Sequence, residues 1–102
     1  MTVEHETIGP NDAWVASRDV VMTELGDGLA LLNLATNEYF SLNDVGAFVW
    51  SVLQTPRQRG EIVRAVTEKY EVAPEVCAPD VDLLLEELKN ATLAEQQPGD
   101  AA

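Results

Sequence analysis

The side chains that could carry out chemistry in this chain are few, and they lie far apart. There is one cysteine, Cys77, and one histidine, His5. A nucleophilic thiol needs a base beside it, and a zinc site needs several Cys, His or carboxylate ligands in one place. Gly26 and Gly28 are followed by neither the lysine nor the helix start of a phosphate-binding loop. We therefore predict no metal site, no cofactor and no thiol active site, and we interpret Cys77 as a small apolar core residue.

Carboxylates are so numerous that pairs of them arise by chance. The chain has 18 Asp and Glu residues against 6 Lys and Arg residues, and its net charge is −12. Acidic residues are concentrated in one predicted helix, as Asp80, Asp82, Glu86 and Glu87. No pattern there predicts the burial that acid–base catalysis needs, so we interpret these side chains as a solvated face. The sequence therefore predicts a protein that is not an enzyme.

Length and composition predict one globular domain. The 102 residues can bury a single core, and 46% hydrophobic with 24% charged residues is a globular balance. The excess of negative charge repels nucleic-acid backbones and anionic lipids, so both are excluded as expected partners. No apolar run approaches the ~20 residues that cross a bilayer. The single cysteine and the lack of a signal-peptide pattern favour a cytoplasmic protein.

The elements that would position a site begin with strands. Residues 1–12 and 95–102 show no periodicity and are predicted to be flexible tails around a domain of residues 13–94. Three short segments rich in apolar and β-branched residues, 20–25, 29–34 and 38–42, predict an antiparallel three-stranded sheet. A further short strand at 14–16 fits the pattern. A two-residue turn at Thr36-Asn37 would pair Leu32 with Ser41.

Helical periodicity starts at Asn43, a good N-cap residue, and predicts a first helix through Leu53. A second helix is expected at about 59–70, and Gln58 with Glu61 suits a capping box at its start. A third helix follows from Pro74. Pro79 lies inside that helix and predicts either a separate first turn or a bend. The main apolar stripe of this helix includes Leu84, and a half-apolar neighbouring face contains Val76, Asp80, Leu83 and Glu87.

This order of elements predicts an α+β fold, a winged helix-turn-helix whose three-stranded antiparallel sheet precedes three α-helices. Such folds often bind DNA through the third helix, so a winged-helix transcriptional regulator is one alternative function. The third helix here is strongly acidic, with Lys89 as its single basic residue among five acids. That charge argues against DNA. A small hydrolase that depends on Cys77 is a third hypothesis.

The segment Leu34-Ala-Thr-Asn-Glu-Tyr-Phe-Ser-Leu-Asn-Asp-Val-Gly-Ala-Phe-Val-Trp50 carries a more specific signal. It resembles the PqqD-like family, whose members bind the leader peptides of ribosomally made, post-translationally modified peptides. The resemblance extends over about residues 20–93. Departures from the family pattern are Asn37 where glycine is common, Gln58 where serine or threonine is usual, and Pro79. Of these, only Pro79 would change the shape of a groove.

The resemblance implies a mechanism without chemistry. The leader peptide would add as an antiparallel strand beside residues 38–42, in a cleft next to the third helix. The implied peptide-binding residues are Glu38, Tyr39, Phe40, Ser41, Leu42, Val76, Asp80, Leu83, Leu84 and Glu87. By strand alternation we interpret Phe40 as a core residue and Tyr39 as core rim or groove. The implied partners are the precursor and either a leader peptidase, as in lasso-peptide pathways, which we favour by analogy, or a radical S-adenosylmethionine enzyme.

Overall fold

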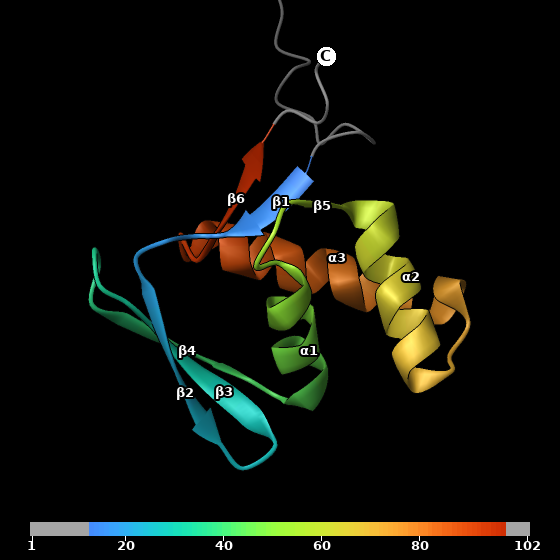
Figure 1. Ribbon diagram of the computed structural model, residues 1–102, viewed down its shortest axis with the longest axis horizontal. Helices are drawn as coiled ribbons and strands as arrows, with labels where there is room; N and C mark the ends of the chain where they lie inside the picture. Colours follow the sequence, from blue (N-terminus) through green and yellow to red (C-terminus); the bar gives the residue numbers. More distant parts are fainter. Residues whose placement is uncertain (1–12, 98–102) are drawn as a thin grey trace, which may run out of the picture.

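A meander of three antiparallel strands forms the sheet on which the site is built. In the computed structural model, which describes residues 13–97, these strands are β2 (Val20–Leu25), β3 (Gly28–Asn33) and β4 (Glu38–Leu42), in the order β2-β3-β4. Figure 1 shows this sheet projecting beside the helices. The predicted antiparallel sheet followed by three helices is confirmed. Gly26, with φ of 60°, occupies the short turn between β2 and β3 and supplies the left-handed conformation there.

The register of the second hairpin differs from the prediction by two residues. Leu32 pairs with Tyr39, and Asn33 with Glu38, so four residues rather than two lie in the turn. Asn33 determines this geometry, because its side-chain Oδ1 accepts hydrogen bonds from the amides of Ala35 (2.8 Å) and Thr36 (3.2 Å). Its carbonyl accepts another from Asn37, which has φ of 64°. A shift of two residues preserves the face on which each side chain lies.

A second small sheet joins the two ends of the described chain. Its strands are β1 (Ala13–Ala16), β5 (Arg57–Gln58) and β6 (Ala94–Gln97), in the order β5-β1-β6. Figure 1 shows β1 and β6 side by side. Residues 95–97 therefore form a strand, and their assignment to the C-terminal tail is corrected. Their polar sequence carries no strand pattern, because the pairing partner is at the other end of the chain. Residues 1–12 and 98–102 of the predicted tails lie outside the described residues.

The three helices start close to their predicted residues. Helix α1 (Asp44–Val52) has Asn43 as N-cap, and the Asn43 side chain accepts a hydrogen bond of 2.8 Å from the amide of Gly46. Helix α2 (Arg59–Tyr70) starts with a 2.8 Å hydrogen bond from the amide of Gln58 to the Glu61 carboxylate. Helix α3 (Pro74–Asn90) is continuous and includes Pro79, so the proline does not divide it into two segments.

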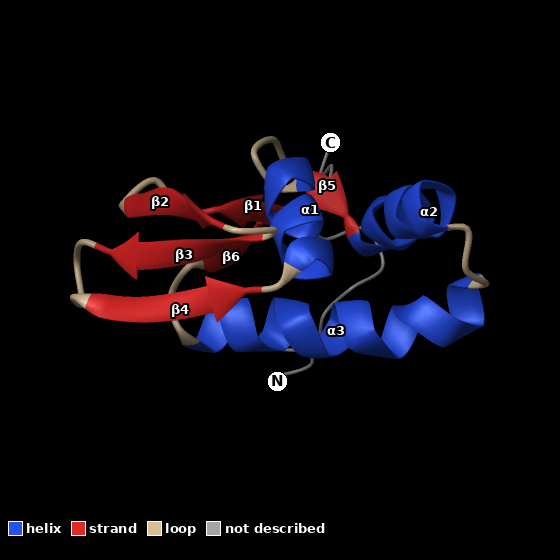
Figure 2. Ribbon diagram, turned by 90° about the horizontal axis from the view of Figure 1, so that it is seen from below, coloured by secondary structure: helices blue, strands red, loops and turns tan. Residues whose placement is uncertain are grey.

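The core lies between the β2-β3-β4 sheet, the three helices and β1. Its fully buried large side chains are Trp14, Leu31, Leu53, Ile62, Leu85, Leu88, Leu93 and Val49. Cys77 is also buried, as expected for an apolar filler, and its Sγ lies 3.9 Å from the carbonyl oxygen of Val63. Figure 2 shows α3 running along the molecule on the β4 side, with α1 on the opposite side. No helix within residues 13–97 has the length and hydropathy to span a membrane.

Buried Asn33 ties the sheet to the end of α3. Its Nδ2 donates to the carbonyl oxygen of Thr92 at 2.9 Å, while its Oδ1 holds the β3–β4 turn. Asn33 is 1% exposed, so each of these polar groups would be costly to leave without a partner. One side chain therefore fixes the position of the hairpin relative to the turn that follows α3.

Candidate functional site

The outer edge of β4 is available for pairing. The amide of Leu34 donates to the carbonyl of Asp19 at 2.8 Å, which sets the alternation of the ladder. The main-chain groups of Leu34, Leu32, Ala30 and Gly28 therefore bond to the β2 side. Those of Leu29, Leu31 and Asn33 bond to β4. On β4 the partners of those three are Leu42, Phe40 and Glu38. Tyr39 and Ser41 consequently direct their amides and carbonyls away from β3, and within residues 13–97 no strand pairs with that edge.

A groove runs beside this edge and has a volume of about 340 Å³. One wall is the end of β4 with the first turn of α1, and the other is α3. The lining residues are Phe40, Ser41, Leu42, Asn43, Val45, Gly46, Asp80, Leu84 and Glu87. We call this the β4 groove. An extended peptide placed in it could pair with the main chain of β4 and direct alternate side chains towards α3.

The β4 groove adjoins an apolar hollow of about 410 Å³ between α1, α2 and α3. The two share Val45, Asp80 and Leu84. The further lining of the hollow is Val49, Val66, Tyr70, Val72, Val76, Cys77 and Val81. Because a continuous depression leads from an open strand edge to an apolar hollow, the site suits a peptide that carries an aliphatic or aromatic side chain beyond its paired segment.

Two glycines keep the strand end close to its neighbours. At Gly46 a Cβ would lie 3.1 Å from Leu42 Cδ2, so α1 can approach β4 closely. At Gly28 a Cβ would collide with the carbonyl oxygen of Leu42, so no larger residue fits opposite the end of β4. Both positions hold the C-terminal end of β4, where the groove begins.

The sequence-predicted site residues fall into three groups. Those that line the β4 groove are Phe40, Ser41, Leu42, Asp80, Leu84 and Glu87. Val76 lines the adjoining hollow instead. The side chains of Glu38, Tyr39 and Leu83 line neither depression. Phe40 packs partly buried against the core, as interpreted from the sequence. Tyr39 is 77% exposed and cross-strand from Leu32, on the outer face of the sheet rather than at the core rim or in the groove.

Leu83 lies at the margin of the groove. It is 61% exposed, and on the helix surface it neighbours Asp80 and Glu87 at i−3 and i+4, which both line the groove. Three lining residues went unpredicted, namely Asn43, Val45 and Gly46. The available signal was that α1 starts directly after β4, which places the first helical turn at the end of the groove.

The charged surface beside the groove is acidic. Asp80 and Glu87 are exposed on α3 and face the groove from the same side. Asp82, on another face of α3, forms a two-pronged ion pair with Arg59 at the start of α2. The hydrogen bonds that the Arg59 guanidinium donates to the Asp82 carboxylate raise the pKa of Arg59 above its ordinary value. This pair connects α2 to α3 and leaves the groove acids available to a ligand.

Solved structures of two other proteins share this architecture, and both are described as complexes with a leader peptide. A chain of TbiB1, in a structure described as its complex with the TbiA(beta) leader peptide, is 34% identical with a TM-score of 0.71, and the match covers 79% of this chain and 94% of that chain. A chain of lasso peptide synthetase B1, described as complexed with the leader peptide, is 23% identical with a TM-score of 0.68. That match covers 80% of this chain and 96% of that chain, and it shows the shared fold.

No curated protein matches the chain. Residues 28–94, from the start of β3 to the start of β6, match the PqqD family, described as coenzyme PQQ synthesis protein D. The matched segment contains the open strand edge, the three helices and the whole β4 groove. With more than half of its residues in that match, the chain belongs to the PqqD family.

Proposed function

We propose that this protein binds the leader peptide of a ribosomally synthesised, post-translationally modified peptide precursor and does not itself catalyse a reaction. The observation that carries the proposal is the open edge of β4 beside a groove walled by α3. The related TbiB1 chain is described in complex with a leader peptide, which supports the same ligand class for this chain. We favour a lasso-peptide precursor, because the fold is shared with a lasso peptide synthetase B1 chain complexed with the leader peptide. Ribosomes make such precursors in the cytoplasm, where we place the protein.

The geometry suggests how the leader is held. Its main chain would bond to the outward amides and carbonyls of Tyr39 and Ser41, which gives affinity with little dependence on sequence. Side chains on one face of the added strand would contact Leu84 and the margin residue Leu83. Selectivity would come from the apolar hollow beyond Val45 and from the carboxylates of Asp80 and Glu87, because both depend on the side chains of the leader.

A bound leader must also be delivered to an enzyme, either a leader peptidase or a radical S-adenosylmethionine enzyme. The outer face of the sheet offers a surface for this contact. Val21, Leu32 and Tyr39 lie directly across from one another on three adjacent strands, and Val21 is 48% exposed. An exposed apolar stripe of this kind is typical of a protein interaction surface. It lies on the opposite face from the helices, so a partner could bind there while the groove is occupied.

Titration of the purified chain with the precursor encoded beside its gene tests the proposal. Fluorescence anisotropy of a labelled leader should show saturable binding with a dissociation constant of about 10 µM or tighter. A reversed-sequence leader of identical composition is the matched control and should bind at least about tenfold more weakly. Absence of saturable binding, or equal binding of the reversed peptide, would reject leader recognition.

A further inference from the structure

The β2-β3-β4 sheet has a second open edge, along β2. The same ladder alternation that points Tyr39 and Ser41 outward on β4 directs the main-chain groups of Val20, Met22 and Glu24 away from β3. Within residues 13–97 no strand pairs with this side of β2. Edge strands that stay unpaired usually contain a lysine, a proline or a bulge. β2 contains neither residue type and pairs with β3 over its whole length without a bulge, and its one charged residue is Glu24, which would repel an acidic strand and attract a basic one. It is therefore suited to accept another strand.

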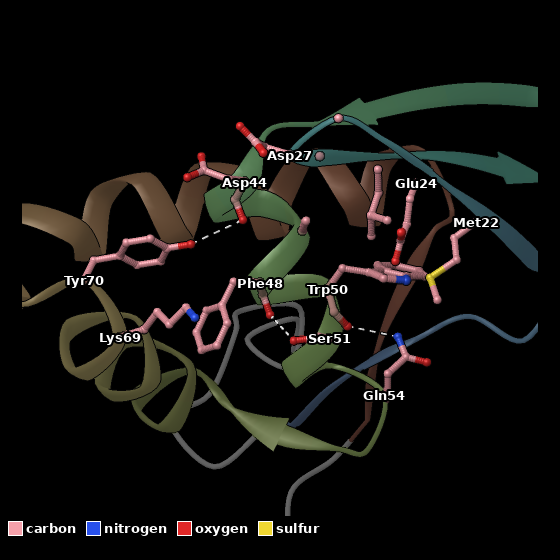
Figure 3. A pocket seen from close by; sticks show the side chains of 14 residues that line it. Met22, Glu24, Asp27, Asp44, Phe48, Trp50, Ser51, Gln54, Lys69 and Tyr70 are labelled. Carbon is pink, nitrogen blue, oxygen red and sulfur yellow. Dashed lines mark hydrogen bonds between the residues drawn. The ribbon is translucent and has the colours of Figure 1, made fainter.

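A cleft of about 560 Å³ adjoins this edge, between the β2–β3 hairpin, α1 and the end of α2. We call it the β2 cleft. Its apolar lining includes Met22, which is 56% exposed, and partly buried Phe48, while Trp50 lies beneath them as a buried floor residue that is 4% exposed. Figure 3 shows Met22 and Glu24 projecting from β2 over the ring of Trp50. The cleft shares no lining residue with the β4 groove, so it is a separate feature of the surface.

The rim of the β2 cleft is acidic. It contains Glu24, Asp27 and Asp44, and within the described part of the chain none of the three forms an ion pair. Figure 3 shows Asp27 and Asp44 next to each other on one side of the cleft. Lys69 is the only basic residue in the lining of this cleft, and its Nζ lies 5.6 Å from the centre of the Phe48 ring. The cleft therefore carries an uncompensated negative potential around an apolar floor.

We propose that the β2 cleft binds an extended, basic segment of a second protein. This segment adds to β2 as a strand, places an aliphatic side chain against Met22 and Phe48 above the buried Trp50, and directs lysine or arginine side chains towards the acidic rim. A second copy of this chain is a poor occupant, because its net charge of −12 would bring like charges together. The inference is independent of leader binding, since β2 and β4 are opposite edges of the sheet.

Trp50 provides an optical readout for this cleft. The chain has two tryptophans, both in the core, and only Trp50 also lines the cleft, beneath Met22. Trp14 is 1% exposed and its Nε1 has no hydrogen-bond partner among the described residues. Replacement of Trp14 by phenylalanine removes this unpaired donor while it keeps an aromatic ring in the core. Trp14→Phe therefore leaves Trp50 as the single reporter, and circular dichroism checks that the variant is folded.

The test titrates the Trp14→Phe chain with the peptide acetyl-Lys-Val-Leu-Val-Lys-Val-amide, in which lysine, leucine and lysine share one face of a strand. A saturable change in Trp50 emission is expected, with a dissociation constant below about 1 mM. A peptide with both lysines replaced by glutamate should bind at least about tenfold more weakly, and so should a peptide N-methylated at alternate residues. The first control tests the charge and the second tests the strand hydrogen bonds.

Variants of the protein locate the binding. Met22→Pro removes an outward amide from β2 without removing a hydrogen bond to β3. The variant should bind the lysine-containing peptide at least about fivefold more weakly. Ser41→Pro makes the same change on β4 and should leave this peptide unaffected. The inference fails if no saturable change occurs, if the glutamate peptide binds equally well, or if Ser41→Pro weakens binding in place of Met22→Pro. Sedimentation that shows a dimer lost in Met22→Pro would assign the edge to a second copy and also overturn it.

Discussion

Replacement of Ser41 by proline isolates the contribution of the β4 main chain to leader binding. The Ser41 amide points to the open side of β4, so proline removes a donor that no residue of the described chain uses. Proline also favours extended backbone at the preceding residue, Phe40, which is already in the strand. The change should therefore reduce the free energy of unfolding by less than about 1 kcal/mol.

The expected loss of affinity follows from the unpaired acceptor on the leader. A leader carbonyl opposite Ser41 would lose its donor and remain poorly solvated in the groove, which costs about 1–3 kcal/mol. This corresponds to a dissociation constant that is about 5- to 150-fold weaker. Isothermal titration calorimetry with the leader measures the affinity, and urea unfolding measures stability.

Two further variants separate main-chain from side-chain effects. Ser41→Ala retains the amide and should bind the leader within about twofold of the original chain. Tyr39→Pro removes the other outward amide and should act like Ser41→Pro. If both proline variants retain full affinity while they remain folded, the leader does not add to β4 as a strand, and the proposed mode of binding is refuted.

Four more substitutions test the surroundings of the site. Leu84→Glu places a charge in the half-buried wall of the groove and should cost about 2 kcal/mol or more of stability in urea unfolding, whereas Leu83→Glu should weaken leader binding with almost no change in stability. Asn33→Ala removes the partners of the Thr92 carbonyl and the turn amides, and we expect a loss of about 1–3 kcal/mol in the same assay; an unchanged midpoint would contradict that role. Gly28→Ala should lower the melting temperature and shift the amide resonances of Leu42, because its methyl group would meet the Leu42 carbonyl; spectra that match the parent chain would disprove the close approach.

The elements that the sequence predicted well are those defined by local signals. Helix α1 starts where the Asn43 cap predicts it, and α2 starts after the interaction of Gln58 with Glu61. Strands β2 and β4 have the predicted bounds because apolar residues fill them and turn residues flank them. The groove residues of β4 and α3 then follow from the order of these elements, together with the resemblance of residues 34–50 to a known family.

The features that the sequence did not predict depend on contacts between distant residues. Strand β6 contains Glu95 and two glutamines, and only its pairing with β1 makes it a strand. The two-residue shift of the β3–β4 hairpin has a similar origin, because Asn33 is an ordinary turn residue in the sequence. In the structure its side chain is buried against the Thr92 carbonyl and also accepts the Ala35 and Thr36 amides, which favours the longer turn.

These distant contacts also explain how an exposed edge strand can keep a fixed position. At one end of β4 the turn is held by Asn33, which bonds to the segment after α3. At the other end Leu42 is buried and packs against Gly28 and Gly46. Both walls of the β4 groove are thus joined to the same core, so little ordering entropy remains to be lost when a peptide binds. Loss of the Asn33 contact would loosen β4 relative to α3. Asn33→Ala should therefore weaken leader binding by more than the decrease in the folded fraction of the protein accounts for.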